Sequence, residues 1–252
     1  MRILAIDTTS EYGGAAVFDQ KECLAIALNS EPASRYAVTL FELADRALSQ
    51  ARMGFPDIDL FAVCNGPGSF TGIRVGLAAV QGWARAFRSP AKGVNLLEAM
   101  VEQAHPNADW AVPVVDARRG EFFAGFYRRT VEPGGTQSCL EAGGLGQLVR
   151  PERFQAMLDA LRQGGQCRTF MGGTIAFITR AHDLKARSLR EGLPHDLLGI
   201  EVPGVLLEAI AKVALRACEQ GEKPSSDDLD ACYIRHSDAE MKWRAPAAKA
   251  GS

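Results

Sequence analysis

The chain has 252 residues, 47% of them hydrophobic and 23% charged, which is typical of a globular protein with one large or two modest domains. Its formal net charge of −2 argues against a protein whose main task is to grip phosphate backbones, because such proteins carry a basic excess. The six cysteines form no C-x-x-C pair, and no apolar run is long enough for a signal peptide or a membrane span. We therefore expect a soluble, cytoplasmic protein.

The first hundred residues predict three strands in an antiparallel opening, followed by helices that alternate with short strands. Apolar residues at helical spacing predict the helices, and short apolar runs bounded by turn residues predict the strands. The expected strands cover 2–7, 15–19, 23–28, 60–64 and a short segment from 94, and the expected helices cover 34–50, 73–88 and 96–104.

The second half begins with another apolar strand and then becomes less regular. Residues 130–150 are rich in Gly, Pro and polar side chains, which indicates a loosely ordered excursion. The residues after 243 have the composition of a disordered tail. The expected strands cover 110–116, 121–128 and 169–171, and the expected helices cover 151–162, 174–181 and 203–220.

The two halves share a pattern in which a strand ends on an aspartate and returns after a small turn. Asp7 and Asp116 occupy the corresponding places. Such a repeat predicts two related α/β lobes with mixed sheets flanked by helices, and it resembles the actin-like (ASKHA, RNase H-like) superfamily. We expect lobes over 1–104 and 105–243, with the helix over 203–220 able to pack back on the first lobe, and a disordered tail over 244–252.

A glycine-rich loop over 65–72 leads into the helix that follows the fourth strand. On that helix Gly72, Gly76, Ala79 and Trp83 share one face, and the small residues allow another backbone to come close. Two interpretations remain open. The face either packs against another helix of the same lobe or docks a second protein. A phosphate-binding interpretation of the loop is weak, since the P-loop lysine and the G-x-G-x-x-G pattern are both missing.

The segment GPGSFTGIRVGLAAVQGWARAF, residues 66–87, closely resembles the signature of the TsaB (YeaZ) family. Weaker matches to the same family are ILAIDTTSE at 3–11, DARRGEFFAGFY at 116–127 and the Tyr-Ile-Arg segment at 233–235. The resemblance spans nearly the full chain. It implies the actin-like fold and a non-catalytic subunit of tRNA threonylcarbamoyladenosine (t6A) biosynthesis, a role that fold alone does not establish.

The resemblance also implies partners and an interface. The chain is expected to bind a TsaD-type catalytic paralog, to work with a TsaE-type ATPase and to pair with itself when the paralog is absent. The partner subunits would use ATP, tRNA would be bound only through the complex, and this chain would need no cofactor. The interface implied by the family falls on Tyr36, Leu40, Leu43, Gly68, Ser69, Phe70, Thr71, Gly72, Arg74, Val75, Gly76, Ala79 and Trp83.

The residues themselves argue against a catalytic site. The four histidines, at 105, 182, 195 and 236, include no pair at the helical spacing of metal ligands, so no metal site is expected. Asp7 is followed by Thr8-Thr9-Ser10 instead of an early glycine, so we interpret it as a residue that caps its own turn. Three alternatives remain: an active small-molecule kinase of the actin-like superfamily, a direct tRNA-binding module, and a peptidase that acts on the paralog.

Overall fold

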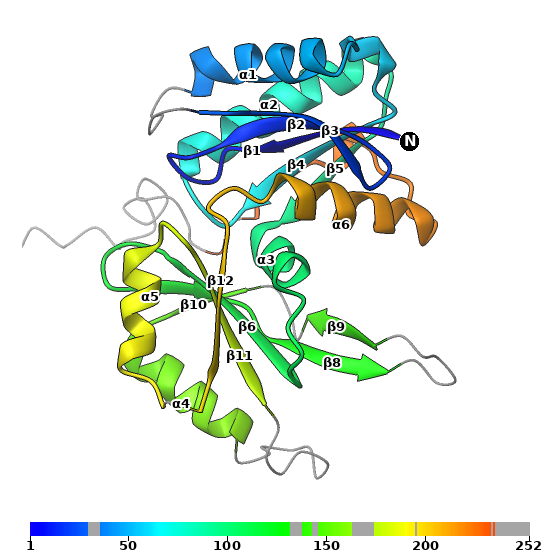
Figure 1. The fold of residues 1–252 in the computed structure, drawn as a ribbon. Helices are drawn as coiled ribbons and strands as arrows, with labels where there is room; N and C mark the ends of the chain where they lie inside the picture. Colours follow the sequence, from blue (N-terminus) through cyan, green and yellow to red (C-terminus); the bar gives the residue numbers. More distant parts are fainter. Residues whose placement is uncertain are drawn as a thin grey trace, which may run out of the picture.

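A computed structural model gives the fold of the chain. It describes residues 1–29, 36–131, 138–142, 146–162, 174–194, 196–232 and 234. Two mixed sheets lie one above the other, with helices between them and on their outer sides (Figure 1). The prediction of an α/β protein with two related lobes is therefore confirmed.

The two sheets repeat one plan. The first has the order β3-β2-β1-β4-β5, with β1 antiparallel to β2 and parallel to β4. The second has the order β10-β7-β6-β11-β12, with β6 antiparallel to β7 and parallel to β11. β1 and β6 are thus equivalent, and their last residues, Asp7 and Asp116, occupy equivalent positions.

The strands of the first sheet are β1 (Arg2–Asp7), β2 (Gly14–Asp19), β3 (Glu22–Leu28), β4 (Leu60–Gly66) and β5 (Ala91–Asn95). The strands of the second are β6 (Trp110–Asp116), β7 (Phe122–Ala124), β10 (Gln147–Val149), β11 (Ile175–Arg180) and β12 (Leu198–Val202). Two further strands, β8 (Tyr127–Val131) and β9 (Ser138–Ala142), form a hairpin that continues from β6.

β1 is apolar along its length because helices cover both faces of the sheet. Leu4 and Ile6 belong to the core on the outer side, with the helices α1 (Tyr36–Gln50) and α2 (Phe70–Phe87). Ile3 and Ala5 belong to the core on the inner side, where α6 (Leu207–Glu219) lies. Successive side chains of a strand point to opposite faces, so a strand covered on both sides needs apolar residues throughout.

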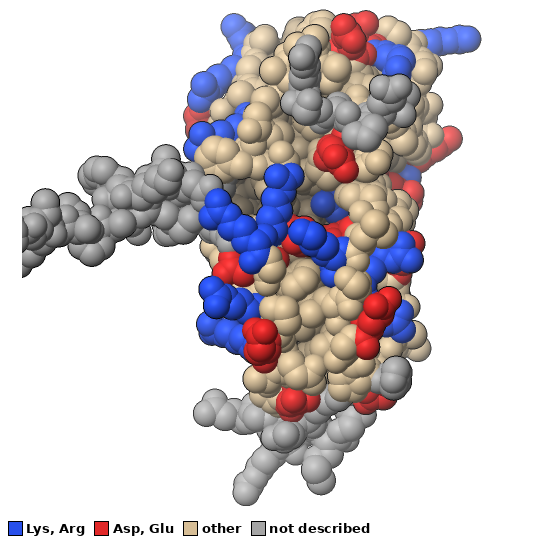
Figure 2. Space-filling model, turned by 90° about the vertical axis from the view of Figure 1, so that its left-hand side faces the viewer, with Lys and Arg blue, Asp and Glu red and all other residues tan. Residues whose placement is uncertain are grey.

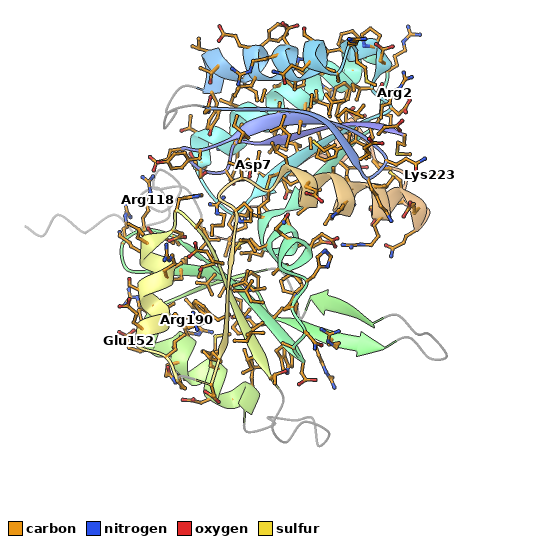
Figure 3. All side chains as sticks on the ribbon, in the orientation of Figure 1. Arg2, Asp7, Arg118, Glu152, Arg190 and Lys223 are labelled. Atoms are coloured by element: carbon orange, nitrogen blue, oxygen red, sulfur yellow. The ribbon has the colours of Figure 1, made fainter. Side chains whose placement is uncertain are left out.

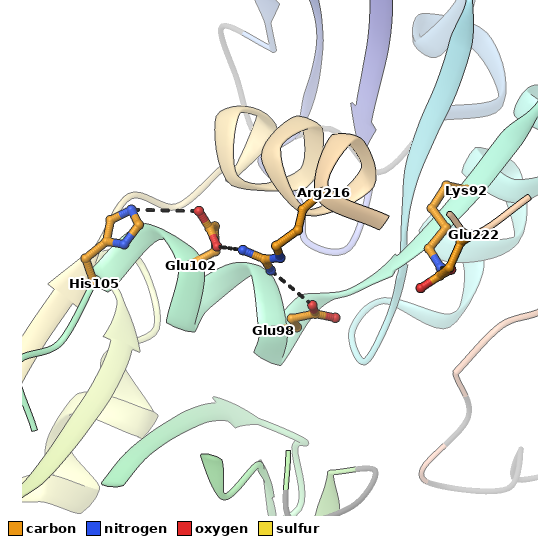
Figure 4. A network of polar contacts seen from close by, with 6 residues as sticks. All are labelled: Lys92, Glu98, Glu102, His105, Arg216 and Glu222. Carbon is orange, nitrogen blue, oxygen red and sulfur yellow. Dashed lines mark hydrogen bonds and ion pairs between the residues drawn. The ribbon is translucent and has the colours of Figure 1, made fainter. Parts of the chain in front are cut away.

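Two helices fill the space between the sheets, α6 against the first and α3 (Leu96–Ala104) against the second (Figure 1). They share one apolar core, in which Ile3 of the first sheet and Ile178 of the second both take part. Arg216 of α6 adds a polar link to α3, since it contacts Glu102 and lies 3.4 Å from Glu98 (Figure 4). The predicted boundary between the two lobes at residue 104 stays a prediction.

The outer face of the second sheet is covered by α4 (Pro151–Arg162) and α5 (Leu184–Glu191). Phe154 and Leu158 of α4 are fully buried against this sheet, and Ala186 of α5 joins the same core. Figure 1 therefore shows five layers: outer helices, the first sheet, the inner helices, the second sheet and again outer helices.

Several sequence predictions were wrong in detail. The helix expected over 174–181 is the strand β11, because its apolar residues are buried on both faces instead of along one stripe. The strand expected over 121–128 is divided between β7 and β8, which pair with different parts of β6. The described part of 130–150 includes β9 and β10. The strand expected over 169–171 and the tail lie outside the described residues.

The last described segment returns to the first lobe. A short 3-10 helix, η2 (Ser226–Asp228), packs against α2, and Leu229 is buried in the core beneath α1 and α2. The side-chain amide of Gln81 donates to the carbonyl oxygen of Leu229 (3.0 Å). The backbone N–H of Cys232 donates to the carbonyl oxygen of Asn65 (2.8 Å). These hydrogen bonds join the end of the described chain to α2 and to the start of the glycine-rich loop.

Candidate functional site

Asp7 ends β1 at the junction of the two lobes (Figure 3) and is fully buried. Its Oδ1 accepts hydrogen bonds from the backbone N–H of Thr9 (3.0 Å) and from the Thr9 hydroxyl (2.7 Å). Its Oδ2 accepts from the backbone N–H of Leu206, just before α6 (3.3 Å). Both carboxylate oxygens therefore serve the chain's own fold, which confirms that Asp7 caps its own turn.

Arg180 reaches this junction from the second lobe. Its side chain is almost entirely buried, and its Nη1 donates to the hydroxyl of Thr9 (3.1 Å) and to the carbonyl oxygen of Gly204 (3.4 Å). Because the same hydroxyl donates to Asp7, it joins a buried cation of one lobe to a buried carboxylate of the other. Arg180 has no signal in the sequence, because it lies in the segment 174–181 whose pattern predicts a helix.

The glycines of the loop and of α2 pack against the turn that follows β1. A Cβ on Gly72 would overlap the carbonyl oxygen of Thr8, and a Cβ on Gly76 would lie 2.5 Å from the Thr8 hydroxyl oxygen. A Cβ on Gly68 would lie 2.8 Å from Cβ of Thr9. These glycines therefore serve internal packing. Their neighbour is a turn and not the expected helix, and a contribution of Gly72 and Gly76 to docking stays a prediction.

Three further residues of the predicted interface are buried inside the first lobe. Tyr36, Leu40 and Leu43 of α1 are each no more than 5% exposed. The Tyr36 hydroxyl donates to the carbonyl oxygen of Ser10 (2.8 Å) and so fixes the turn between β1 and β2. Burial, together with the nearby charge of Asp7, raises the pKa of Tyr36 to about 12. These side chains support the surface from beneath and offer a partner little to contact.

Other residues of the predicted interface do lie at the surface. Phe70, Thr71 and Arg74 are exposed at the start of α2, and the Arg74 guanidinium stacks 3.8 Å from the centroid of the Phe70 ring. Partly exposed positions of the same prediction are Gly68, Ser69, Val75, Ala79 and Trp83. Their use by a partner stays a prediction.

The structure adds an aromatic cluster between α1 and α2, of which only Trp83 belongs to the predicted interface. Phe41 is 59% exposed and Phe87 is 37% exposed. Phe55, in the short 3-10 helix η1 (Phe55–Asp57), lies between them, with its ring centroid 4.9 Å from that of Trp83. We call Phe41, Phe55, Trp83 and Phe87 the aromatic patch. The available signal was that Phe41 lies at the edge of the helical stripe that α1 buries.

The second strand-ending aspartate, Asp116, is less buried and makes different contacts. Its Oδ1 accepts from the backbone N–H of Arg118 (2.8 Å), and its Oδ2 lies 3.7 Å from Nζ of Lys185. Its own backbone N–H donates to Asp183, which also caps α5 (2.7 Å). Asp116 thus forms an ion pair with Lys185, while its described contact with Arg118 is through the backbone.

The described residues contain no group of three His, Cys, Asp or Glu side chains close enough to hold a metal ion. Two of the four histidines, His195 and His236, fall outside those residues. Within the same part of the chain, no helix is both long enough and apolar enough to cross a membrane. That the chain needs no cofactor stays a prediction.

Comparisons with known proteins agree with this architecture. Residues 30–152 match the family profile described as TsaD, tRNA N6-adenosine threonylcarbamoyltransferase. A Bacillus subtilis protein named tRNA threonylcarbamoyladenosine biosynthesis protein TsaB is 25% identical over 96% of this chain and 98% of its own length. The Escherichia coli protein of the same name is 33% identical over 51% of this chain and 56% of its own length.

A solved structure extends the comparison to the fold. A Pseudomonas aeruginosa protein described as similar to peptidase YEAZ superposes with a TM-score of 0.70 and 20% identity, covering 93% of this chain and 99% of that one. At this identity the structure supports the fold alone. The chain is similar to the named TsaB relatives, over nearly the full length of the Bacillus subtilis protein, and this is the family that the glycine-rich segment resembles.

Proposed function

We propose that this chain is a non-catalytic subunit of t6A biosynthesis that binds and stabilises a TsaD-type catalytic paralog. The relatives named for t6A biosynthesis support the pathway. The match of residues 30–152 to the TsaD family profile supports a relationship to the TsaD-type protein, which would make that partner a paralog. A TsaE-type ATPase would complete the assembly, and tRNA would be bound through the complex.

The aromatic patch is the observation that carries this proposal. Its rings form a continuous cluster, with Phe55 stacked on Phe87 at 5.5 Å and on Phe41 at 5.8 Å. Exposed aromatic clusters are uncommon on monomeric proteins and enriched at protein interfaces. The exposed face of α2 beside it carries the small residues Ala78 and Gly82, which allow a partner helix to approach. The patch is therefore suited to a helix-on-helix contact.

The lobe junction supports a non-catalytic role. In nucleotide-using actin-like proteins, the turn after the first aspartate holds phosphate. Here the Thr8 hydroxyl donates to the carbonyl oxygen of Gly72 (2.8 Å), and the carbonyl oxygen of Thr9 accepts from Ser69 (2.7 Å). The turn is thus packed against the glycine-rich loop, and Asp7 has both oxygens engaged. This arrangement favours a binding subunit over the alternative of an active kinase.

The same surface gives the chain a way to pair with itself. Without the paralog, two copies would cover the aromatic patch symmetrically, since a two-fold interface uses the same surface on both subunits. The paralog and a second copy would then compete for one surface. The isolated chain should be a dimer that the paralog converts into a heterodimer.

The test is size-exclusion chromatography with light scattering of the chain alone and mixed with its TsaD-type paralog. The informative variant is Gly82→Arg, because a Cβ at this exposed position would meet no atom within 4 Å and glycine is a poor helix residue. The matched control is Ala160→Arg, an exposed position of α4 in the other lobe. We expect Gly82→Arg to fold normally and to lose both complexes, and Ala160→Arg to keep them.

Two outcomes would contradict the proposal. If the wild-type chain forms no complex with the paralog, the binding role is wrong, and ATP turnover by the isolated chain should be measured next. If the complex forms and Gly82→Arg leaves it intact, the chain is a partner but α2 is not its docking helix.

A further inference from the structure

The turn between β6 and β7 has an unusual backbone. Arg118 (φ 64°), Arg119 (φ 59°) and Gly120 (φ 74°) are three consecutive left-handed residues. Glycine adopts this conformation freely, and among other residues asparagine and aspartate tolerate it best. Two adjacent arginines are therefore an unfavourable choice for the fold, and such strain tends to persist where a side chain has a function.

The rest of the turn holds these arginines in place. The carboxylate of Asp116 accepts the backbone N–H of Arg118 (2.8 Å). The backbone N–H of Ala117 donates to the carbonyl oxygen of Glu121 (2.9 Å), and that of Glu121 donates to Arg118 (3.1 Å). Both arginine side chains are exposed. The turn is thus an ordered element that places two arginine side chains at the surface.

These arginines belong to a basic area at the junction of the lobes. Figure 2 shows Lys and Arg side chains gathered across the middle of this face, and Figure 3 places Arg118 on the same side of the molecule. Lys185 of α5 adjoins the turn through Asp116 and is 66% exposed. Of the nearby acidic groups, Asp116 is shared between Lys185 and the turn, Glu121 lies 3.6 Å from Arg150, and Glu11 is exposed on the first lobe.

The closed lobe junction decides what kind of anion fits this surface. A small phosphate ligand needs a recess lined with donors, but the turn after Asp7 is packed against the glycine-rich loop. The exposed cations instead suit a polyanion that stays on the outer surface of the second lobe, beside the junction. Only a few phosphates would be contacted, which is compatible with the net charge of −2.

We propose that Arg118 and Arg119, with Lys185, contact the phosphate backbone of the RNA substrate in the assembled complex. This inference rests on the proposed function for the identity of the RNA. The contact supplies affinity without reading base sequence, because guanidinium and ammonium groups recognise the backbone alone.

The test removes the charge and keeps the turn. In the variant R118N/R119N, asparagine favours the same left-handed backbone, so the fold should be at least as stable as in the wild type. Its control is R52N/R88N, which replaces two other exposed arginines that are also left-handed (φ 57° and 56°) at the ends of α1 and α2. Each variant removes two positive charges from left-handed residues, and the two variants differ only in where those residues lie on the surface.

Binding of a fluorescent anticodon stem-loop RNA is measured by anisotropy over a salt series, with the isolated chain and with its complex with the paralog. We expect R118N/R119N to weaken binding and to reduce the slope of log affinity against log salt by about 1 to 2. The control should retain the wild-type slope. Thermal melting of both variants verifies the fold.

The possible failures can be told apart. If the complex forms and R118N/R119N binds RNA as the wild type or the control does, this inference is wrong and the proposed function stands. If no complex forms but the isolated chain loses salt-dependent RNA binding only in R118N/R119N, the RNA contact stands and the proposed function fails. If R118N/R119N loses paralog binding but keeps the wild-type RNA affinity, the arginines contact an acidic surface of the paralog instead. If neither the chain nor its complex binds RNA, the inference is also wrong.

Discussion

The two strand-ending aspartates occupy equivalent positions in the two sheets, yet their surroundings differ. Asp7 is fully buried, accepts three hydrogen bonds and is linked through Thr9 to Arg180. Asp116 is partly exposed and holds the backbone of a turn that directs two arginines outward. The topology of the repeat therefore fixes where an aspartate lies, while the following turn decides whether it stabilises the interior or organises a surface.

The largest expected effect is at Asp7. Asp7→Asn removes the charge that faces Arg180 and places an amide donor against N–H groups, so we expect a loss of about 3–5 kcal/mol in the free energy of unfolding. Asp116→Asn should cost no more than about 1 kcal/mol, because its ion pair with Lys185 is exposed. Urea denaturation of both variants measures the difference. Equal losses of unfolding free energy would show that Asp7 and Asp116 contribute equally to stability, against the contrast described above.

The glycines of α2 test the same contrast between buried and open positions. Gly72→Ala should destabilise the chain by about 1–3 kcal/mol, because the added methyl overlaps Thr8. Gly82→Ala should stabilise it by up to about 1 kcal/mol, because it fills open space and improves helix propensity. The midpoints of thermal denaturation should move in opposite directions, and a neutral Gly72→Ala would contradict the packing described for this turn.

Much of the fold could be predicted because its strands and helices obey simple periodicities. The runs at 2–7, 60–64 and 110–116 are apolar throughout, as strands between helical layers must be. The segment over 174–181 was misassigned because a short apolar run fits a buried helix equally well. Its β-branched residues, such as Ile175 and Ile178, favoured the strand that the structure shows.

The candidate site was harder to predict, for a physical reason. Small residues on one face of a helix show that something comes close, but not whether it belongs to the same chain. At Gly72 and Gly76 the neighbour is the turn after β1, which is more than 60 residues away in sequence. The exposure of Phe41 and the left-handed backbone of Arg118 likewise depend on tertiary packing, which periodicity does not encode.

The smallest predicted effect is a pH dependence at the lobe junction. Burial, and then the charge of Arg180, lower the pKa of His182 below its ordinary value of 6.5. As the pH falls through that range, the unfolded chain binds a proton that the folded chain does not, so folding stability declines. His182→Phe keeps the ring contact with Tyr12 and should remove this decline between about pH 7 and pH 5. The free energy of unfolding is measured by urea denaturation at several pH values. An equal decline with falling pH in the wild type and in His182→Phe would show that His182 is not the cause.

The return of the last described segment to the first lobe has a consequence for synthesis. A ribosome releases β1 to β5 long before α6 and Leu229, yet these late residues complete the cores on the two faces of that sheet. The nascent first lobe therefore carries an uncovered apolar face that includes Ile3 and Phe18 until most of the chain has emerged. Chains that stop before residue 207 should be targets for chaperones and proteases, which ties the quality control of the first lobe to completion of the second.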